Sequence, residues 1–404
     1  MSRLSVLKDI PRDAKILVST NALRSFSVAV INVSFSIYLS KLGASPIDIG
    51  LTFTGISLFS AFRSLLEGLI ADKIGRKPIL LFTAASMATG GTIFFLTNNL
   101  PILTIAAVLF SVGGTVGYTP AEQAMLSEKV RSEERTKAFS LNAFLGTIAA
   151  IFGSVAGGLP EALQAFGLPE IDSYRQIFII LAVAGAITFC LFTILEETID
   201  RDDQNEITIE GDEAGRDERI FLMKWSGVVA LDMIGGSFGN LISYWYYLRF
   251  GVGPAQIGTL SAVSQFLSSF SYILGFKMAK SFGTITATTL SRLPVVAVNL
   301  LTPLMPSFLA VSVIRVFMSL FSMIDVPLRQ SYLMGVIKTR KRASAVGVVS
   351  VVSRVTAAGA PSLTGYFIQY VSLALPFFCG ASFQLASASL MYFLFKDIKP
   401  PEEE

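Results

Sequence analysis

The sequence predicts an all-α polytopic membrane protein with twelve transmembrane helices in two similar six-helix bundles. Three observations predict this class. Of the 404 residues, 52% are hydrophobic and 15% are charged, whereas soluble globular chains carry about 25% charged residues. The apolar residues gather in runs of about 20, the length that a helix needs to cross a bilayer. Finally, the second half of the chain repeats phrases of the first half.

The apolar runs give the predicted spans in order along the chain. The first six cover residues 16–40, 47–71, 78–98, 101–126, 137–160 and 175–195. The second six cover residues 221–248, 256–280, 284–304, 306–334, 343–370 and 373–395. Residues 196–220 between the two sets are acidic and polar, which is typical of a flexible linker. We therefore predict one bundle over 1–195, a cytoplasmic linker over 196–220, and a second bundle over 221–404.

Basic residues predict the side of the membrane that each loop faces. Lys and Arg gather before the first span and in the loops after the second, fourth and tenth spans, while alternate loops carry almost none. Basic loops stay on the cytoplasmic side, so we expect both termini in the cytoplasm and the protein in the inner or plasma membrane. The N-terminal stretch MSRLSVLKDIPRDAK is polar and basic, and we do not expect a cleaved signal peptide.

The two halves align with a nearly constant offset. YLSKLGASPIDIG, residues 38–50, returns 208 positions later as YYLRFGVGPAQIG, residues 246–258. An offset of 207 aligns spans 4 and 5 with spans 10 and 11 and matches Pro, Gln, Arg and Gly residues. The pattern indicates a duplication with a pseudo-two-fold axis along the membrane normal. Two such halves can expose a central cavity to each side of the membrane in turn.

The loop after the second predicted span carries a recognisable motif, GLIADKIGRK. It closely resembles the signature loop of the major facilitator superfamily, G-x-L-A-D-r-x-G-R-K, and the matching residues are Gly68, Ala71, Asp72, Gly75, Arg76 and Lys77. The resemblance covers the whole chain and implies the twelve-span fold of these transporters. It also implies that Asp72 lies near the start of span 11, beside Arg342, and steadies the outward-open state.

Other positions of this cytoplasmic side follow from the resemblance. We expect Glu128 to join an ion-pair network with Arg76 and Arg135. Span 5 contains GSVAGG, residues 153–158, which resembles the G-P-x-x-G-G motif of the drug/proton antiporter branch with Ser154 in place of proline. Close packing of small residues is the structural alternative. The arginine usual in span 4 of that branch falls on Val108.

Ionisable residues inside the predicted spans are candidate functional positions, because charge is costly in a membrane. Arg24 and Asp232 occupy matched positions with opposite charge, and we expect them to face each other across the cavity. Asn32 and Asn240 would line the same pocket. The Arg24–Asp232 salt bridge opens when substrate or a proton arrives under one interpretation, and is a permanent structural pair under the other.

Three further groups of charges follow from spacing. Asp325 and Arg329 are four residues apart on one predicted helix and can pair locally, as can Arg63 and Glu67. Glu122 matches Arg329 in the repeat, and the two could pair across the inner mouth as a gate.

Arg315, the counterpart of Val108, and Arg354 have no obvious local acid. They suit an anionic substrate, because guanidinium binds carboxylate or phosphate through two hydrogen bonds. The alternative is that they pair with Asp232 or Asp325.

These observations favour a secondary active transporter. The leading hypothesis is proton-coupled efflux of a drug-like or metabolic compound, and the alternative is proton-coupled uptake or exchange of an organic anion. A non-transporting membrane sensor is the hypothesis from another class. The chain has no histidine, so proton transfer falls to carboxylates. We expect a small-molecule substrate, protons and the lipid bilayer as partners, with no nucleic acid, no cofactor, no metal and no catalytic site, and a functional monomer.

Overall fold

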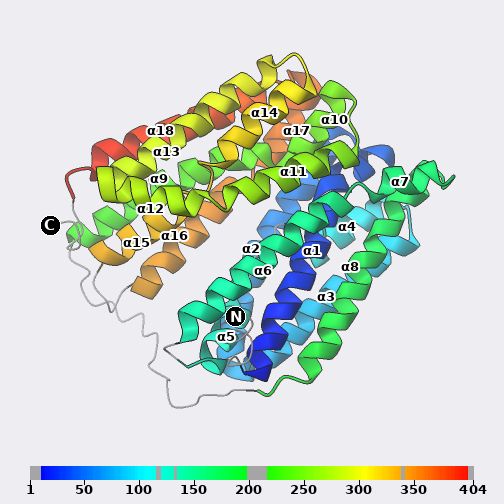
Figure 1. Ribbon diagram of the computed structural model, residues 1–404, viewed down its shortest axis with the longest axis horizontal. Coiled ribbons are helices and arrows are strands. Elements are labelled where there is room, and N and C mark those ends of the chain that lie inside the picture. Colours follow the sequence, from blue (N-terminus) through cyan, green and yellow to red (C-terminus); the bar gives the residue numbers. More distant parts are fainter. Residues whose placement is uncertain (1–10, 115–119, 132–133, 198–215, 338–341, 399–404) are drawn as a thin grey trace, which may run out of the picture. The chain divides into compact units, whose positions relative to one another are not determined.

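The computed structural model describes residues 11–114, 120–131, 134–197, 216–337 and 342–398 (Figure 1). Within these ranges the chain consists of helices and the turns between them, as the sequence predicts. Each predicted span contains one helix or two consecutive helices. Among the described residues, nine segments are long and apolar enough to cross a membrane, and α4 and α14 are shorter apolar helices. The count of twelve spans stays a prediction.

The chain folds into two compact units. Unit 1 consists of Met1–Ala44, Phe59–Asn205 and Gly253–Ala262, and unit 2 of Ser45–Leu58, Glu206–Val252 and Val263–Glu404. Unit 1 takes most of its residues from the first half of the chain and unit 2 from the second half, with two short segments exchanged. The start of the second helix belongs to unit 2, and the matching start of the eighth predicted span belongs to unit 1.

In the described part of the first half, the chain forms eight α-helices. They are α1 (Arg12–Lys41), α2 (Pro46–Ile74), α3 (Arg76–Leu96), α4 (Leu100–Phe110), α5 (Pro120–Lys129), α6 (Arg135–Ala156), α7 (Leu159–Ala165) and α8 (Glu170–Thr193). In unit 1, α1 packs along α6 and α8, and α3 packs along α8 (Figure 1). Two glycines allow the α3–α8 approach, because a Cβ at Gly91 or Gly185 would meet the backbone of the facing helix.

The described residues of the second half form ten α-helices and two 3₁₀ turns. They are α9 (Arg216–Ser237), η3 (Phe238–Leu241), α10 (Ile242–Phe250), α11 (Pro254–Ser268), α12 (Ser271–Phe282), α13 (Thr284–Leu301), η4 (Thr302–Leu304), α14 (Phe308–Ser319), α15 (Asp325–Val336), α16 (Arg342–Ala357), α17 (Ala360–Tyr370) and α18 (Leu375–Phe395). In unit 2, α9 packs against α16 and α18, and α13 packs against α18.

Matched caps start two of the matched helices. The Asn99 side chain accepts a hydrogen bond from the Ile102 N–H at the start of α4. The Ser307 side chain accepts one from the Ala310 N–H at the start of α14. Asn and Ser are favoured at this position because their side-chain oxygens satisfy an otherwise unpaired backbone donor. The two caps lie 208 positions apart, which is one position more than the offset of 207 that aligns the rest of these two spans.

The repeated phrase makes the same helix crossing twice. In unit 2, Gly50 of α2 lies against the carbonyl group of Pro361 on α17. In unit 1, Gly258 of α11 lies against the carbonyl group of Ser154 on α6. A Cβ at either glycine would collide with that carbonyl oxygen. The glycines of the phrase therefore permit close contact of two backbones, and the small residues of GSVAGG supply one of the two facing surfaces.

Candidate functional site

A buried ion pair joins α1 to α5 in unit 1. Arg24 Nη1 donates to Glu122 Oε1 at 2.8 Å, and Arg24 Nη2 donates to Glu122 Oε2 at 2.8 Å. Arg24 Nη2 also donates to the Asn21 side-chain oxygen at 3.2 Å. Arg24 is 4% exposed and Glu122 is 1% exposed. Two parallel charge-assisted bonds fix the relative position of the two helices and neutralise both charges.

A second ion pair lies on α2 of the same unit. Arg63 Nε is 3.1 Å from Glu67 Oε1, four residues along the helix, as the spacing predicts. The Thr83 hydroxyl on α3 donates to the same Glu67 oxygen at 3.4 Å. Glu67 is buried, at 5% exposure. The carboxylate therefore has one cation and one hydroxyl as partners inside the unit.

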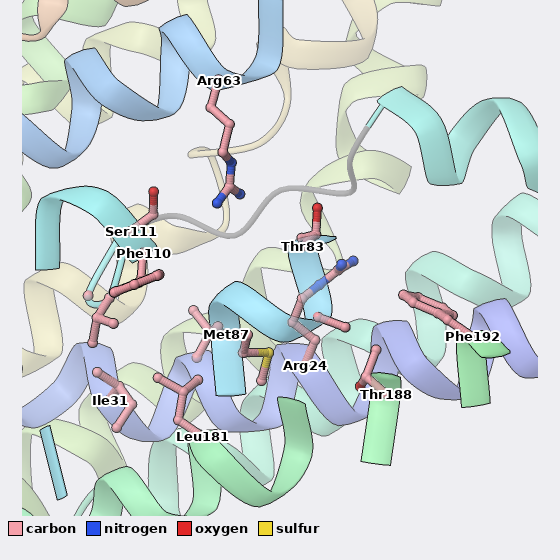
Figure 2. Close-up of a pocket in the computed structure, with 14 residues that line it drawn as sticks. Arg24, Ile31, Arg63, Thr83, Met87, Phe110, Ser111, Leu181, Thr188 and Phe192 are labelled. Atoms are coloured by element: carbon pink, nitrogen blue, oxygen red, sulfur yellow. The ribbon is translucent and has the colours of Figure 1, made fainter. Parts of the chain in front are cut away.

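A cavity of about 50 Å³ lies beside these two pairs. Figure 2 shows Arg63 reaching from α2 toward the side of the cavity where Arg24 and Thr83 lie. Apolar side chains form most of the remaining wall, including Met87 and Leu181. The cavity is therefore mainly apolar, and Arg24, Arg63 and Thr83 are among the few polar side chains that line it.

Unit 2 contains a ring of four charged side chains, which we call the charge ring: Asp232 on α9, Arg292 on α13, and Asp325 and Arg329 on α15. Arg292 Nη2 is 2.5 Å from Oδ2 of Asp232 and 2.5 Å from Oδ2 of Asp325. Arg329 Nη1 donates to Asp232 Oδ2 at 2.9 Å, and its Nη2 pairs with Asp325. The charges cancel, with two anions and two cations.

The two acids of the charge ring are among the most buried polar groups. Asp232 is 4% exposed and Asp325 is 0% exposed. Their Oδ1 atoms are buried without a hydrogen-bond partner among the described residues. A buried acceptor without a donor is costly, so these two oxygens are the positions where the ring can take up a proton or a water molecule.

The pairs of the two units are related by the duplication, with the charges reversed. Arg24 corresponds to Asp232 at an offset of 208, and Glu122 corresponds to Arg329 at an offset of 207. In unit 1 the first helix supplies the cation and α5 supplies the anion. In unit 2 the first helix supplies the anion and α15 supplies the cation. We call this ion pair between the first helix of a unit and its fourth span the tether. The tether thus occurs in both units, with the charges of its two residues reversed.

This arrangement corrects two expected pairings. Arg24 pairs with Glu122 in unit 1 rather than with Asp232, and Arg329 pairs with Asp232 and Asp325 in unit 2 rather than with Glu122. The physical reason is that each unit already contains a complementary partner for its own charged residue. Matched positions in a repeat indicate equivalence, and they do not indicate contact. The local Asp325–Arg329 pair is confirmed.

The charge ring includes one residue without a predicted role, Arg292. It is separated by 60 positions from Asp232 and by 33 positions from Asp325. Its place inside a predicted span was the only signal in the sequence, because no short spacing relates it to either acid.

The two remaining intramembrane arginines do not pair with the acids of the charge ring, because Arg292 and Arg329 occupy those acids. The Arg315 guanidinium carbon lies 5.6 Å from the centre of the Phe377 ring. Arg354 on α16 is exposed. Asn32 on α1 and Asn240 in η3 are exposed as well, and the pocket expected to contain both stays a prediction.

The loop that resembles the family signature is held by Glu197. The Glu197 carboxylate accepts hydrogen bonds from the backbone N–H groups of Arg76, at 2.9 Å, and Lys77, at 3.1 Å. An anion at this place caps the start of α3 and complements the helix dipole. Gly75 has φ 92°, a conformation that favours glycine, and a Cβ there would meet the same carboxylate. Nothing in the motif itself indicated Glu197.

The basic residues of this loop have two further partners. Lys77 Nζ donates to the carbonyl oxygens of Thr193, at 2.8 Å, and Leu195, at 2.7 Å. Arg76 pairs with Glu128, which confirms that expected ion pair.

Arg135, expected in the same network, is exposed at the start of α6. The predicted contact between Asp72 and Arg342, and the side chain of Asp72, lie outside the described residues, as does any packing at Gly68.

Comparisons with known proteins agree with this fold. The model of the Major Facilitator Superfamily matches residues 17–239 and 224–404. An uncharacterized membrane protein of Saccharomyces cerevisiae, YJR124C, is 24% identical over 393 residues, covering 88% of this chain and 87% of that protein. The multi-drug resistance efflux pump PmrA of Streptococcus pneumoniae serotype 4 is 26% identical over 179 residues, 42% of each protein.

Two solved structures share the fold at low sequence identity. The nucleoside transporter NupG has a TM-score of 0.73 at 15% identity, over 96% of this chain and 100% of that chain. The D-xylose-proton symporter has a TM-score of 0.71 at 13% identity, over 96% and 97%. With the family model spanning the described helices of both units, the chain belongs to the Major Facilitator Superfamily and is a multi-pass membrane protein and secondary transporter.

Proposed function

We propose that this transporter exports a small organic compound in exchange for protons, across the plasma membrane and with both termini in the cytoplasm. The observation that carries the proposal is the charge ring, in which Asp232 and Asp325 are buried and each keeps one carboxylate oxygen without a partner among the described residues. In a chain without histidine, buried carboxylates are the groups available for proton coupling.

Protonation of the charge ring has a direct mechanical consequence. In the structure each of its two arginines bridges the two acids, so the ring ties α9, α13 and α15 together. Adding a proton to Asp232 removes one negative charge and leaves two cations facing one anion. The attraction of Arg292 and Arg329 to Asp232 on α9 weakens, because an ion pair in a low-dielectric interior depends on both charges. The helices are then free to take a second arrangement.

The glycine crossings supply the surfaces that separate in alternating access. The α2–α17 crossing brings Gly50 against Pro361 and holds the Thr54 and Ser362 hydroxyl groups 2.6 Å apart. Its matched crossing brings Gly258 against Ser154. These contacts join backbones and small side chains, and we propose that they form and break as the cavity changes sides. The distribution of basic loops supports a position of both crossings toward the outer side of the membrane.

Export is favoured over uptake by two likenesses. PmrA, a multi-drug resistance efflux pump, matches 42% of the chain. The sequence GSVAGG at the end of α6 and the turn after it resembles the antiporter motif, and it contacts α11 through Ser154 and Gly158. A lipophilic organic compound is the corresponding substrate class.

The test uses the purified protein in liposomes with a pH gradient and ethidium as the reporter substrate. We expect wild type to move ethidium in response to the gradient and Asp232→Asn to lose this response while remaining folded. Asp172→Asn removes a half-buried acid whose ion-pair partner among the described residues is Arg175, three residues away, and it serves as the control. Gradient-driven transport by Asp232→Asn at the wild-type rate would overturn the proposal.

A folding defect in the Asp232 variant is separated from a coupling defect by a second variant. Asp232→Asn alone leaves an excess cation in the ring, whereas Asp232→Asn with Arg329→Gln restores neutrality. We expect the double variant to recover stability and to remain uncoupled. Recovery of coupling in the neutral double variant would count against a proton site at Asp232.

Exchange or uptake of an organic anion is the second candidate, and Arg354 favours it. This arginine is exposed on α16, an apolar helix, and no ion pair to it is present among the described residues. An exposed guanidinium on a transport pathway binds carboxylates. Uptake of a radiolabelled monocarboxylate that is lost in Arg354→Gln would favour this candidate over export of a lipophilic compound.

A further inference from the structure

Arg315 has buried donors with no acceptor. It lies on α14 in unit 2, and its Nε and Nη2 atoms have no contact with solvent and no hydrogen-bond partner among the described residues. The acids inside the unit offer no counter-charge, since Asp232 and Asp325 are bound by two other arginines. A guanidinium with buried donor atoms and no counter-charge is rare because its desolvation is not repaid.

Aromatic side chains form the surroundings of this guanidinium. Phe377 lies under it at 5.6 Å, and Trp245 packs against Phe377 with ring centres 4.7 Å apart. Tyr246 follows Trp245 on α10, and its phenol interacts electrostatically with Arg315. Phe308, two turns before Arg315 on α14, packs edge-on against Tyr246 at 5.5 Å. We call Trp245, Tyr246, Phe308 and Phe377 the aromatic cluster.

The aromatic cluster satisfies only part of what the guanidinium needs. A ring below the guanidinium attracts its positive face. The five N–H donors of arginine point outward in the guanidinium plane, where a ring below cannot accept them. An acceptor placed at the edge of the plane, opposite Nε and Nη2, would receive two parallel hydrogen bonds, which is the arrangement that carboxylates adopt with arginine.

The duplication indicates that the fold itself does not require an arginine at position 315. The matched residue in unit 1 is Val108, at an offset of 207, on α4. The same helix position is therefore filled by an apolar side chain when the fold alone has to be satisfied. An arginine in the second copy costs stability in the absence of a ligand, and a ligand accounts for its presence.

We propose that Arg315 and the aromatic cluster form a binding site in unit 2 for a small monovalent anion, either a carboxylate group or a chloride ion. A single negative charge matches the single unneutralised cation, whereas a divalent anion would leave a net charge buried among aromatic rings. If the bound anion is the carboxylate of a transported compound, this inference rests on the proposed transport function. Binding itself does not depend on proton coupling.

The experiment uses Trp245 as a reporter inside the site. The chain has two tryptophans, and Trp225 packs in a separate group with Tyr332 and Phe395. Trp225→Phe therefore leaves a full-length protein whose tryptophan fluorescence comes from Trp245 alone. This protein is titrated with sodium chloride, sodium acetate and sodium benzoate, while sodium sulfate keeps the ionic strength constant.

We expect a saturable change of Trp245 fluorescence with chloride or with the carboxylates, and a higher melting temperature at saturation. Arg315→Gln should weaken binding at least tenfold, and Arg315→Lys should weaken it less, because lysine keeps the charge and loses the two-pronged geometry. Arg175→Gln is the matched control, since Arg175 also lies over a phenylalanine ring, at 6.0 Å, and has Asp172 as its acid.

The outcomes separate the possible ligands and the two proposals. Saturation by chloride alone identifies an ion site, and saturation by acetate and benzoate identifies a carboxylate site. The inference would be overturned if the Trp225→Phe protein showed no saturable fluorescence response. It would also be overturned if Arg315→Lys and Arg315→Gln bound the anion as tightly as the protein with Arg315. Asp232→Asn should leave anion binding unchanged. The two proposals can fail separately. If Asp232→Asn loses proton-driven transport and neither wild type nor any variant binds an anion, the proposed function stands and this inference is refuted.

Discussion

Exchanging the charges of Arg24 and Glu122 should restore a protein that either single reversal breaks. The reason lies in the duplication, because unit 2 builds the matched tether from Asp232 and Arg329 with the opposite polarity. The backbone of this fold therefore already accepts an anion on its first helix and a cation on the fourth span. Arg24→Glu, Glu122→Arg and the double variant test whether unit 1 accepts the same exchange.

The size of the effect follows from the geometry. Arg24 and Glu122 share two hydrogen bonds of 2.8 Å and are both buried. Breaking a buried pair by removing one partner costs about 3–5 kcal/mol. Arg24→Glu also brings two carboxylates together, and at about 4 Å they repel by roughly 4 kcal/mol at an effective dielectric constant of about 20. A single reversal should therefore destabilise unit 1 by on the order of 5 kcal/mol.

The double variant should recover most of this loss. What it does not recover is the bond from Arg24 to the Asn21 side-chain oxygen, since a glutamate at position 24 cannot donate there. The Asn21 amide nitrogen donates to the Asn142 carbonyl oxygen, so turning the amide around would lose that bond instead. One lost hydrogen bond costs about 1 kcal/mol.

The assay is thermal unfolding of the detergent-purified protein, followed by fluorescence. For a unit of about 200 residues, 1 kcal/mol corresponds to roughly 2–4 °C. We expect each single reversal to melt on the order of 10 °C below wild type and the double variant to melt within about 4 °C of it. Single variants that melt like wild type would show that the pair contributes little. A double variant no better than the worse single would refute the tether as an exchangeable unit.

Three further predictions concern the packing and the signature loop. Gly50→Leu should lower the melting temperature through overpacking of about 1–3 kcal/mol, whereas Gly236→Leu, which has no atom within 4 Å of an added Cβ, should be tolerated. Thr54→Cys with Ser362→Cys, in a protein without its native cysteines, should form an oxidant-dependent disulfide that stops transport and is reversed by dithiothreitol. Transport at the wild-type rate in the crosslinked protein would contradict a moving crossing. Glu197→Ala should cost about 1 kcal/mol through loss of the α3 cap, measured as a small drop in melting temperature.

The helical segments were predictable because a bilayer sets the length of an apolar helix. The breaks inside them were not. Span 7 is interrupted by the 3₁₀ turn Phe238–Leu241, and span 10 is divided between α14 and α15. Hydropathy averages over a window of residues and does not register a change in backbone hydrogen bonding. The exchange of residues 45–58 and 253–262 between the compact units also depends on tertiary packing, which the order of spans does not encode.

The charged residues were predictable as a set, and their partners were predictable only within one helix. Spacing of four residues fixes the Arg63–Glu67 contact because helix periodicity is regular. The Arg24–Glu122 pair depends on how two helices are rotated about their axes, which no spacing specifies. The repeat did contain the missing information. Both members of the pair change sign between the halves, as expected of two residues in contact with each other.

The two units differ in how many of their intramembrane arginines are neutralised by an acid, which supports different roles for them. Among the described residues inside unit 1, Arg24 and Arg63 are each neutralised by a glutamate. The charge ring of unit 2 is neutral as well, and the unit contains two more arginines, Arg315 and Arg354, without an acid partner among the described residues. A structural role would require neutrality in both copies of a duplicated fold. Among the described intramembrane residues the excess positive charge occurs in one copy only, which is the reason to propose the anion site in unit 2, whereas the buried ion pair between the first helix and the fourth span occurs in both copies.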